Sequence, residues 1–211
     1  MERIVLSLVV ALLVHTGLAL AHPVSFKGGF GTMPEYSGDR VDLELNYSLT
    51  PTSALGLSTI HAESSHGSVS FVVPRFNHRL YRRNQLESQT NLYLSGGIGG
   101  SMRGDASGIA GLIALQGDFE TRRVYTLLNF EALPSSGGVD LNRARYRAGF
   151  APYLAGFDDL NTWIIFQVDH QTEMDDSWVF SPLLRYFYRN LLLEVGASLH
   201  GDPFIAGIFH F

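Results

Sequence analysis

Three arginines alternate with other residues in the segment Arg143-Ala144-Arg145-Tyr146-Arg147. Successive side chains of a β-strand point to opposite faces, so this spacing places all three guanidinium groups in one column. Arginine columns or rings attract negatively charged solutes when they line a pore. The segment therefore predicts an anion-attracting surface, provided that residues 142–150 form a strand whose arginine face lines a water-filled space.

A second candidate site is the triplet His66-Gly67-Ser68, in which the histidine could act as a base toward the serine hydroxyl. A third residue must orient such a histidine, and the candidates in this part of the chain are Glu63 and Asn77. The glycine favours a hairpin connection at the same place. We therefore rank a turn above a catalytic dyad at this triplet.

The amino terminus provides a third candidate. Met1-Glu2-Arg3 precedes an apolar segment over 4–14, and Ala19-Leu20-Ala21 matches the cleavage pattern of a secretory signal peptide. The apolar segment is short for a spanning helix, which needs about 20 residues, so a retained anchor is the weaker alternative. Cleavage after Ala21 gives a signal peptide over 1–21 and a mature chain over 22–211.

The mature chain would begin at His22, whose α-amine and imidazole together could chelate copper or nickel. The other histidines of the mature chain form no closely spaced cluster: His61, His66, His78, His170, His200 and His210. We therefore predict no cofactor and no metal site, with copper at His22 as a minor alternative.

Composition excludes several classes of protein. The 211 residues include no Cys, which excludes disulfides, thiol catalysis and cysteine-bound zinc. A net charge of −5 provides no basic surface for nucleic acid. The mean hydropathy of +0.09 argues against disorder, which requires low hydrophobicity.

The elements that must position these residues are strands. Apolar and polar residues alternate over 41–49, 178–189 and 191–199, as expected for strands with two different faces. Eleven turn signals divide the mature chain into twelve strand candidates, with ten strands as the second choice. Strands that cross a membrane need about 9–11 residues, which this spacing allows. We predict one all-β domain over 22–211, an antiparallel up-and-down barrel.

A soluble sandwich or lipocalin-like barrel is the structural alternative. Long apolar faces rich in aromatic residues favour a barrel that contacts lipid instead. The last segment, 204–211, ends on Phe211 and places Phe209 and Ile205 on the same face. With the signal peptide and the alternating strands, this ending resembles bacterial outer-membrane β-barrel proteins.

The resemblance implies location in the bacterial outer membrane, with both termini periplasmic and lipids around the barrel. It also implies that Phe211 and Phe209 form a signal for the barrel-assembly machinery. Outer-membrane phospholipases and lipid A deacylases have a histidine and a serine at the spacing of His66 and Ser68, which keeps lipid hydrolysis open as a minor alternative.

If the apolar faces contact lipid, the opposite faces line the lumen. The inward cations would be the arginine column with Arg75, Arg79, Arg185 and Arg189, and the inward acids would be Asp42, Glu44, Asp118, Glu131, Asp169 and Glu194. The hairpins are expected to place Arg185 opposite Glu194, Arg143 opposite Glu131, and Asp169 near Arg143.

Arg145 and Arg147 are expected to face Asn129 and Leu127, which are not acids. We therefore predict that Arg145 and Arg147 are the better pore residues, and that Arg143 and Arg185 are more structural. The predicted function is a small channel for passive passage of small solutes, with a preference for anions and without enzyme activity. The alternative is a closed barrel with a salt-bridged lumen and a structural, adhesion or assembly role. The sequence predicts neither the solute nor the oligomeric state.

Overall fold

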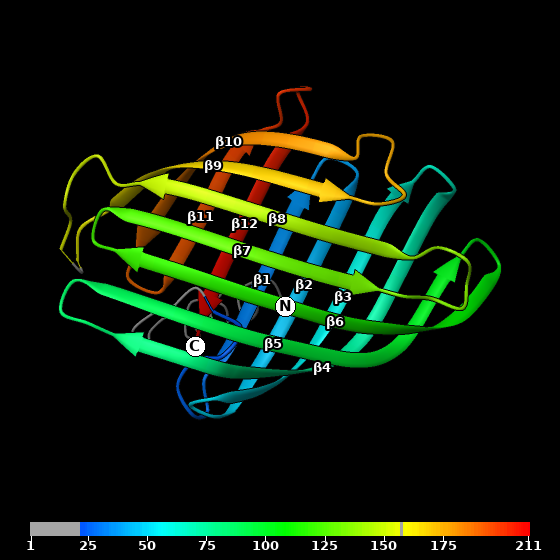
Figure 1. The fold of residues 1–211 in the computed structure, drawn as a ribbon, viewed down its shortest axis with the longest axis horizontal. Coiled ribbons are helices and arrows are strands. Elements are labelled where there is room, and N and C mark those ends of the chain that lie inside the picture. Colours follow the sequence, from blue (N-terminus) through cyan, green and yellow to red (C-terminus); the bar gives the residue numbers. More distant parts are fainter. Residues whose placement is uncertain (1–21, 157) are drawn as a thin grey trace, which may run out of the picture.

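The computed structural model describes residues 22–156 and 158–211 as a closed barrel of twelve antiparallel strands (Figure 1). The strands are β1 (Phe30–Ser37), β2 (Arg40–Thr50), β3 (Ser53–Ser64), β4 (Gly67–Asn84), β5 (Ser88–Arg103), β6 (Ala106–Thr121), β7 (Val124–Leu133), β8 (Leu141–Phe150), β9 (Asn161–Gln171), β10 (Trp178–Tyr188), β11 (Leu191–Ala197) and β12 (Pro203–His210). The predicted strand number and up-and-down topology are confirmed. The predicted signal peptide over 1–21 lies outside the described residues and stays a prediction. Within the two described ranges, no helix is long and apolar enough to cross a bilayer.

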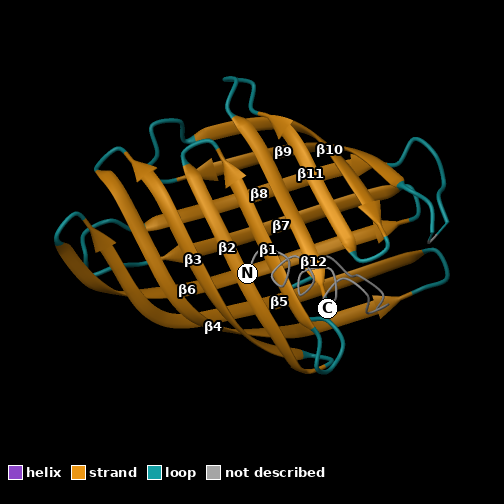
Figure 2. Cartoon of the chain, turned by 180° about the vertical axis from the view of Figure 1, so that it is seen from behind, coloured by secondary structure: helices purple, strands orange, loops and turns teal. Residues whose placement is uncertain are grey.

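Each strand pairs with its neighbours in sequence, and β1 pairs with β12 to close the barrel (Figure 2). The closure extends to the last residue, because the Phe30 and Phe211 backbones exchange two hydrogen bonds of 3.1 and 2.8 Å. We call the end that carries Phe30, Phe211 and the connections 51–52, 85–87, 122–123, 151–160 and 189–190 the terminal end. The opposite end is called the distal end.

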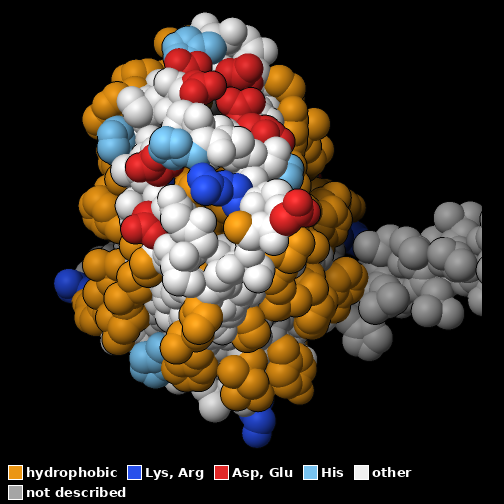
Figure 3. All heavy atoms as spheres, turned by 90° about the vertical axis from the view of Figure 1, so that its right-hand side faces the viewer, with side chains coloured by type: hydrophobic (Ala, Val, Ile, Leu, Met, Phe, Trp, Pro, Cys, Tyr) orange, Lys and Arg blue, Asp and Glu red, His pale blue; other side chains and the backbone are white. Residues whose placement is uncertain are grey.

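Side-chain alternation divides the barrel into an apolar outside and a polar inside. In β2, Val41, Tyr47 and Leu49 point outward and are 46%, 48% and 41% exposed, whereas Arg40 and Asn46 are buried in the lumen. Seen end-on, hydrophobic side chains surround the barrel wall, and acidic and histidine side chains gather at the distal end (Figure 3). A soluble barrel has the reverse arrangement, so this surface is built to contact lipid.

The distal half of the lumen between β3 and β8 is filled by an apolar cluster. Its members are Ile60, Ala62, Val69, Phe71, Val73, Ala110, Leu112, Ala114, Leu133, Val139 and Leu141, which we call the apolar cap. The connection 134–140 folds onto β6 through hydrogen bonds of Ser136 N to Ile109 O and of Gly111 N to Pro134 O, both 2.9 Å. Gly108 permits this approach, because a Cβ there would lie 2.5 Å from the Gly137 nitrogen.

Candidate functional site: the lumenal charge network

Twelve ion-paired side chains, six arginines and six acids, cross the lumen and form what we call the charge network. Its members are Arg40, Arg75, Arg143, Arg145, Arg147, Arg185, Glu35, Asp42, Glu44, Glu131, Asp169 and Glu194. Since the two charge signs are equal in number, the network is neutral when all members are ionised. Burying an ion without a partner costs several kcal/mol, so this balance is a condition for a packed lumen.

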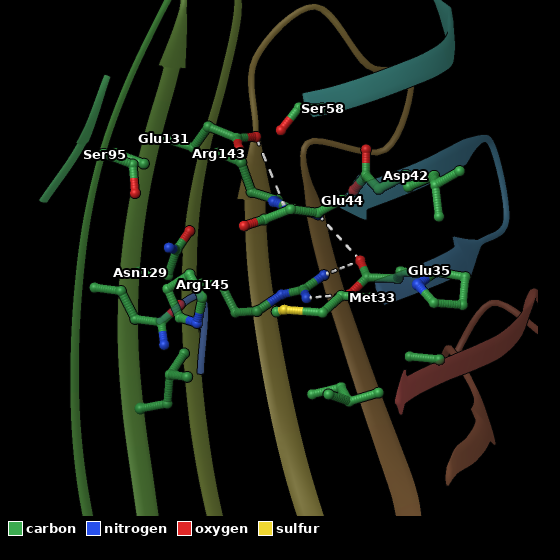
Figure 4. Close-up of a pocket in the computed structure, with 18 of the residues that line it drawn as sticks. Met33, Glu35, Asp42, Glu44, Ser58, Ser95, Asn129, Glu131, Arg143 and Arg145 are labelled. Atoms are coloured by element: carbon green, nitrogen blue, oxygen red, sulfur yellow. Dashed lines mark hydrogen bonds and ion pairs between the residues drawn. The ribbon is translucent and has the colours of Figure 1, made fainter. Parts of the chain in front are cut away.

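Arg145 lies at the centre of the network (Figure 4). Its Nη1 and Nη2 donate to the two carboxylate oxygens of Glu35 at 2.6 and 2.7 Å, and its Nε donates to Asp169 at 2.6 Å. Two parallel hydrogen bonds between a guanidinium and a carboxylate are among the strongest ion-pair geometries. Glu35 lies on β1 and Arg145 on β8, which are not neighbouring strands, so this pair bridges the lumen.

Arg147 and Arg185 share one carboxylate. Glu194 accepts from Arg147 Nη1 at 3.0 Å and from Arg185 Nε at 2.7 Å. Arg147 Nε also donates to Gln167 at 2.7 Å, and the Arg185 guanidinium lies 4.2 Å from the centre of the Tyr125 ring. Both arginines are therefore held in fixed positions by their neighbours.

The remaining ion pairs join strands on different parts of the wall. From β8, Arg143 Nη1 lies 3.1 Å from both Glu35 on β1 and Asp42 on β2. On β2, Arg40 joins Asp42 to Glu131 of β7 at 2.9 and 2.6 Å. On β4, Arg75 donates to Glu44 of β2 at 2.8 Å and to Asn77 at 2.9 Å.

Two of the predicted cross-strand positions are confirmed. Arg185 is directly opposite Glu194, and Arg143 is directly opposite Glu131. Residues 189–190 form a tight connection between β10 and β11, whereas β7 and β8 are joined by the longer connection 134–140, which is held against β6. In the second case the two charges are 3.8 Å apart, and the shorter contacts of Arg143 are to Glu35 and Asp42.

Asp169, which was expected near Arg143, lies directly opposite Arg145, and Gln171 is the residue directly opposite Arg143. Asp169 is therefore a diagonal neighbour of Arg143, and its ion pair is with Arg145. A change of partner by two residues keeps the lumenal face and changes the ion pair.

Arg145 and Arg147 face Asn129 and Leu127 on β7, as predicted. They nevertheless have acidic partners, which come from β9, β11 and the far wall, so the absence of an acid on β7 does not leave them unpaired. Arg189 was expected in the lumen and instead is exposed, 3.2 Å from Asp158. Arg79 is half-buried beside a bulge in β4, outside the charge network.

Sequence reasoning missed Glu35 and Arg40. Proline at 34 and glycine at 38 favour a turn around Glu35, whereas β1 continues through Glu35 to Ser37. Arg40 lies two residues before Asp42 in β2, so the alternation of the strand places it on the same inward face. Extending the alternation to this position could have identified it.

The other candidate residues lie apart from the network. His66 Nε2 is 2.8 Å from Glu173, whereas Ser68 donates to Glu63 at 2.7 and 2.8 Å, so the two side chains contact different carboxylates. Within residues 22–156 and 158–211, no group of three or more metal-ligating side chains is arranged to hold an ion. Phe209 lies in β12, and Phe211 follows it with its ring 6.5 Å from that of Phe30.

A cavity of about 160 Å³ adjoins the network. Met33, Tyr93 and Asn129 line it together with network residues (Figure 4). Arg143 Nε and Arg147 Nη2 are buried there without a hydrogen-bond acceptor in the described part of the chain. A polar cavity of this size can hold ordered water.

The closed even-stranded barrel, its apolar outer wall and its charged lumen define an outer-membrane β-barrel protein. No protein-family model and no curated protein sequence matches the chain. Among solved structures, OccAB4 of Acinetobacter baumannii aligns over 85% of this chain and 55% of its own, with 11% identity and a TM-score of 0.41. A loop-deletion mutant of OmpT, an outer membrane protein of Vibrio cholerae, aligns over 87% of this chain and 97% of its own, with 9% identity and a TM-score of 0.30. The chain thus spans about half the length of OccAB4.

Proposed function

We propose that this protein is a closed, non-conducting barrel with a structural role in the bacterial outer membrane. One observation carries the proposal: the arginines of the column, Arg143, Arg145 and Arg147, are all ion-paired with acids from other strands. An anion that entered the lumen would have to replace a carboxylate already bound at 2.6 to 3.1 Å. The neutral network therefore supports a filled lumen over an anion-selective pore.

Two further features support this choice. The apolar cap fills the distal half of the lumen between β3 and β8, where passing ions would lose their hydration. The distal connections 38–39, 65–66 and 104–105 are short, which favours a structural role over adhesion through long loops.

The proposed orientation places the terminal end in the periplasm. Four connections there, 51–52, 85–87, 122–123 and 189–190, are short, as periplasmic turns of such barrels are. In this orientation Phe209 and Phe211 lie at the periplasmic side, where the barrel-assembly machinery would bind them during insertion.

The test is single-channel recording of the refolded mature protein in a planar bilayer, with folding confirmed by circular dichroism. We expect no discrete conductance steps from the protein or from an Arg145→Ala/Arg147→Ala variant. Anion-selective steps from the unmodified protein that lose selectivity in the variant would overturn the proposal.

Passage of small solutes is the second candidate, and the cavity of about 160 Å³ favours it. This candidate requires water to connect the cavity with both mouths. It predicts small steps whose reversal potential in a salt gradient depends on Arg145 and Arg147. Lack of enzyme activity also stays a prediction, tested by phospholipid and lipid A hydrolysis with Ser68→Ala as the control.

A further inference from the structure

The segment that precedes β1 enters the lumen at the terminal end. His22, Pro23, Val24 and Ser25 are all buried. Val24 is fully buried in a cluster with Ala54 and Tyr93. The Ser25 backbone nitrogen donates to Ser48 Oγ at 2.9 Å, and Gly28 N donates to Ser48 O at 2.7 Å. We call residues 22–25 the amino-terminal plug.

His22 occupies a polar site at the inner end of this plug. Its Nε2 lies 3.3 Å from the side-chain amide nitrogens of Gln89 and Asn91. Amide nitrogens only donate hydrogen bonds, so Nε2 is the unprotonated acceptor and the ring is neutral. The proton then lies on Nδ1, which is 3.6 Å from Asp118 Oδ2.

Asp118 differs from the acids of the charge network because no arginine or lysine in the described chain forms an ion pair with it. It is only 5% exposed. Asn91 donates to its Oδ1 at 2.7 Å, whereas its Oδ2 has no hydrogen-bond donor among the described residues. Arg82 and Arg185 attract this carboxylate through space without forming an ion pair with it, and Arg82 donates to Asn91 at 2.7 Å. A buried carboxylate without a directly paired cation is costly.

We propose that the α-ammonium of mature His22 is the cation that pairs with Asp118. Cleavage after Ala21 would turn the His22 backbone nitrogen into an ammonium group, four covalent bonds from the Nδ1 atom that already faces Asp118 Oδ2. Removal of the signal peptide thereby completes the site and fixes the amino-terminal plug in the terminal mouth of the barrel. This inference rests on the predicted cleavage site and not on the proposed absence of conductance.

A metal chelate is the other chemistry for these atoms. The α-amine, Nδ1 and Asp118 could ligate one divalent ion, but Nδ1 would then have to lose its proton to Nε2. A protonated Nε2 would face the amide donors of Gln89 and Asn91 at 3.3 Å. The observed hydrogen bonds therefore favour the ion pair.

Competitive amine labelling of the folded mature protein tests the pairing. Lys27 is the sole lysine of the chain, and its exposed side chain serves as an internal reference. A free α-amine has a pKa of about 7.7–8.0, and each unit of increase reduces its reactive fraction about tenfold near neutral pH. The measured quantity is the labelling rate of the His22 amine divided by that of Lys27. We expect this ratio to be at least tenfold lower in the folded protein than in the urea-unfolded chain.

Asp118→Asn should remove this protection, and Glu120→Gln, an acid two residues along the same strand, should leave it in place. A chain that retains Ala21 as its first residue moves the amine and should also lose protection, which keeps the test usable if Asp118→Asn does not fold. Equal labelling of the unmodified and Asp118→Asn proteins would overturn the proposal. So would loss of protection with EDTA, which would indicate a chelated metal, or a mature amino terminus other than His22 by mass spectrometry.

Discussion

Glu194→Gln tests whether the charge network stabilises the barrel. The side chain of Glu194 is 3% exposed and lies 2.7 Å from Arg185 and 3.0 Å from Arg147. Glutamine has almost the same shape and keeps one acceptor oxygen, so the substitution removes charge with little change in packing. It removes the shared carboxylate of two buried guanidinium groups, those of Arg147 and Arg185.

The expected loss follows from the burial of these partners. Removing one member of a buried ion pair typically costs about 3–5 kcal/mol, because the other charge stays buried. Arg147 Nη2 keeps a distant contact of 3.8 Å with Glu35, whereas Arg185 has Glu194 as its one ion-pair partner among the described residues. We therefore expect the free energy of unfolding to fall by at least about 3 kcal/mol, which is the lower limit of that range.

The assay is equilibrium unfolding by urea in lipid vesicles, followed by tryptophan fluorescence. Asp158→Asn is the matched control, because it removes an acid from an ion pair of 3.2 Å whose side chains are 73% and 50% exposed. Exposed pairs contribute about 0–1 kcal/mol, so this control should unfold almost as the unmodified protein does. If both substitutions cost the same, the network does not stabilise the barrel and the reasoning is refuted.

Three further outcomes are expected. Leu133→Ala opens a cavity in the apolar cap and should reduce the free energy of unfolding by about 2–5 kcal/mol in the same assay. Ile113→Arg places a charge on the lipid face in the middle of β6 and should cost about 2–4 kcal/mol, whereas Ile113→Leu should cost little. In the turn 38–39, partial burial, followed by repulsion from Asp202 and Asp175, raises the pKa of Asp39. A raised folded-state pKa means that the folded protein binds this proton more tightly, so stability should increase as pH falls through that pKa toward the ordinary pKa of an aspartate. Asp39→Asn should reduce this increase, and an unchanged pH profile of the melting temperature would contradict the assignment.

The fold could be predicted from the sequence because its signals are local. Alternation over 41–49 needs only the neighbouring residues to separate a lipid face from a lumenal face, and β2 has that pattern. Short connections such as 189–190 fix the register directly, which is why the pairing of Arg185 with Glu194 was predictable. The connection 151–160 is longer and fixes its register less tightly, so the exact partner of Asp169 on β8, Arg145, was not predictable.

The bridge from Arg145 to Glu35 could not be predicted in the same way. The two residues are 110 positions apart and lie on strands that do not pair. Their contact depends on the diameter of the closed barrel and on how far a guanidinium reaches across it. A strand-by-strand analysis gives the face of each residue and its two neighbours, and it carries no information on the opposite wall.

Three groups of residues occupy different parts of the lumen, so a channel would have to pass all three. The amino-terminal plug lies buried at the terminal end, the charge network crosses the middle, and the apolar cap occupies the distal half between β3 and β8. Substituting Glu35 removes one of the two acidic partners of Arg145, leaves its ion pair with Asp169, and leaves the plug and the cap in place. A single substitution in the network should therefore lower stability without producing conductance. Conductance in Glu35→Gln alone would show that the network is the only barrier, and that the plug and the cap leave a continuous water path.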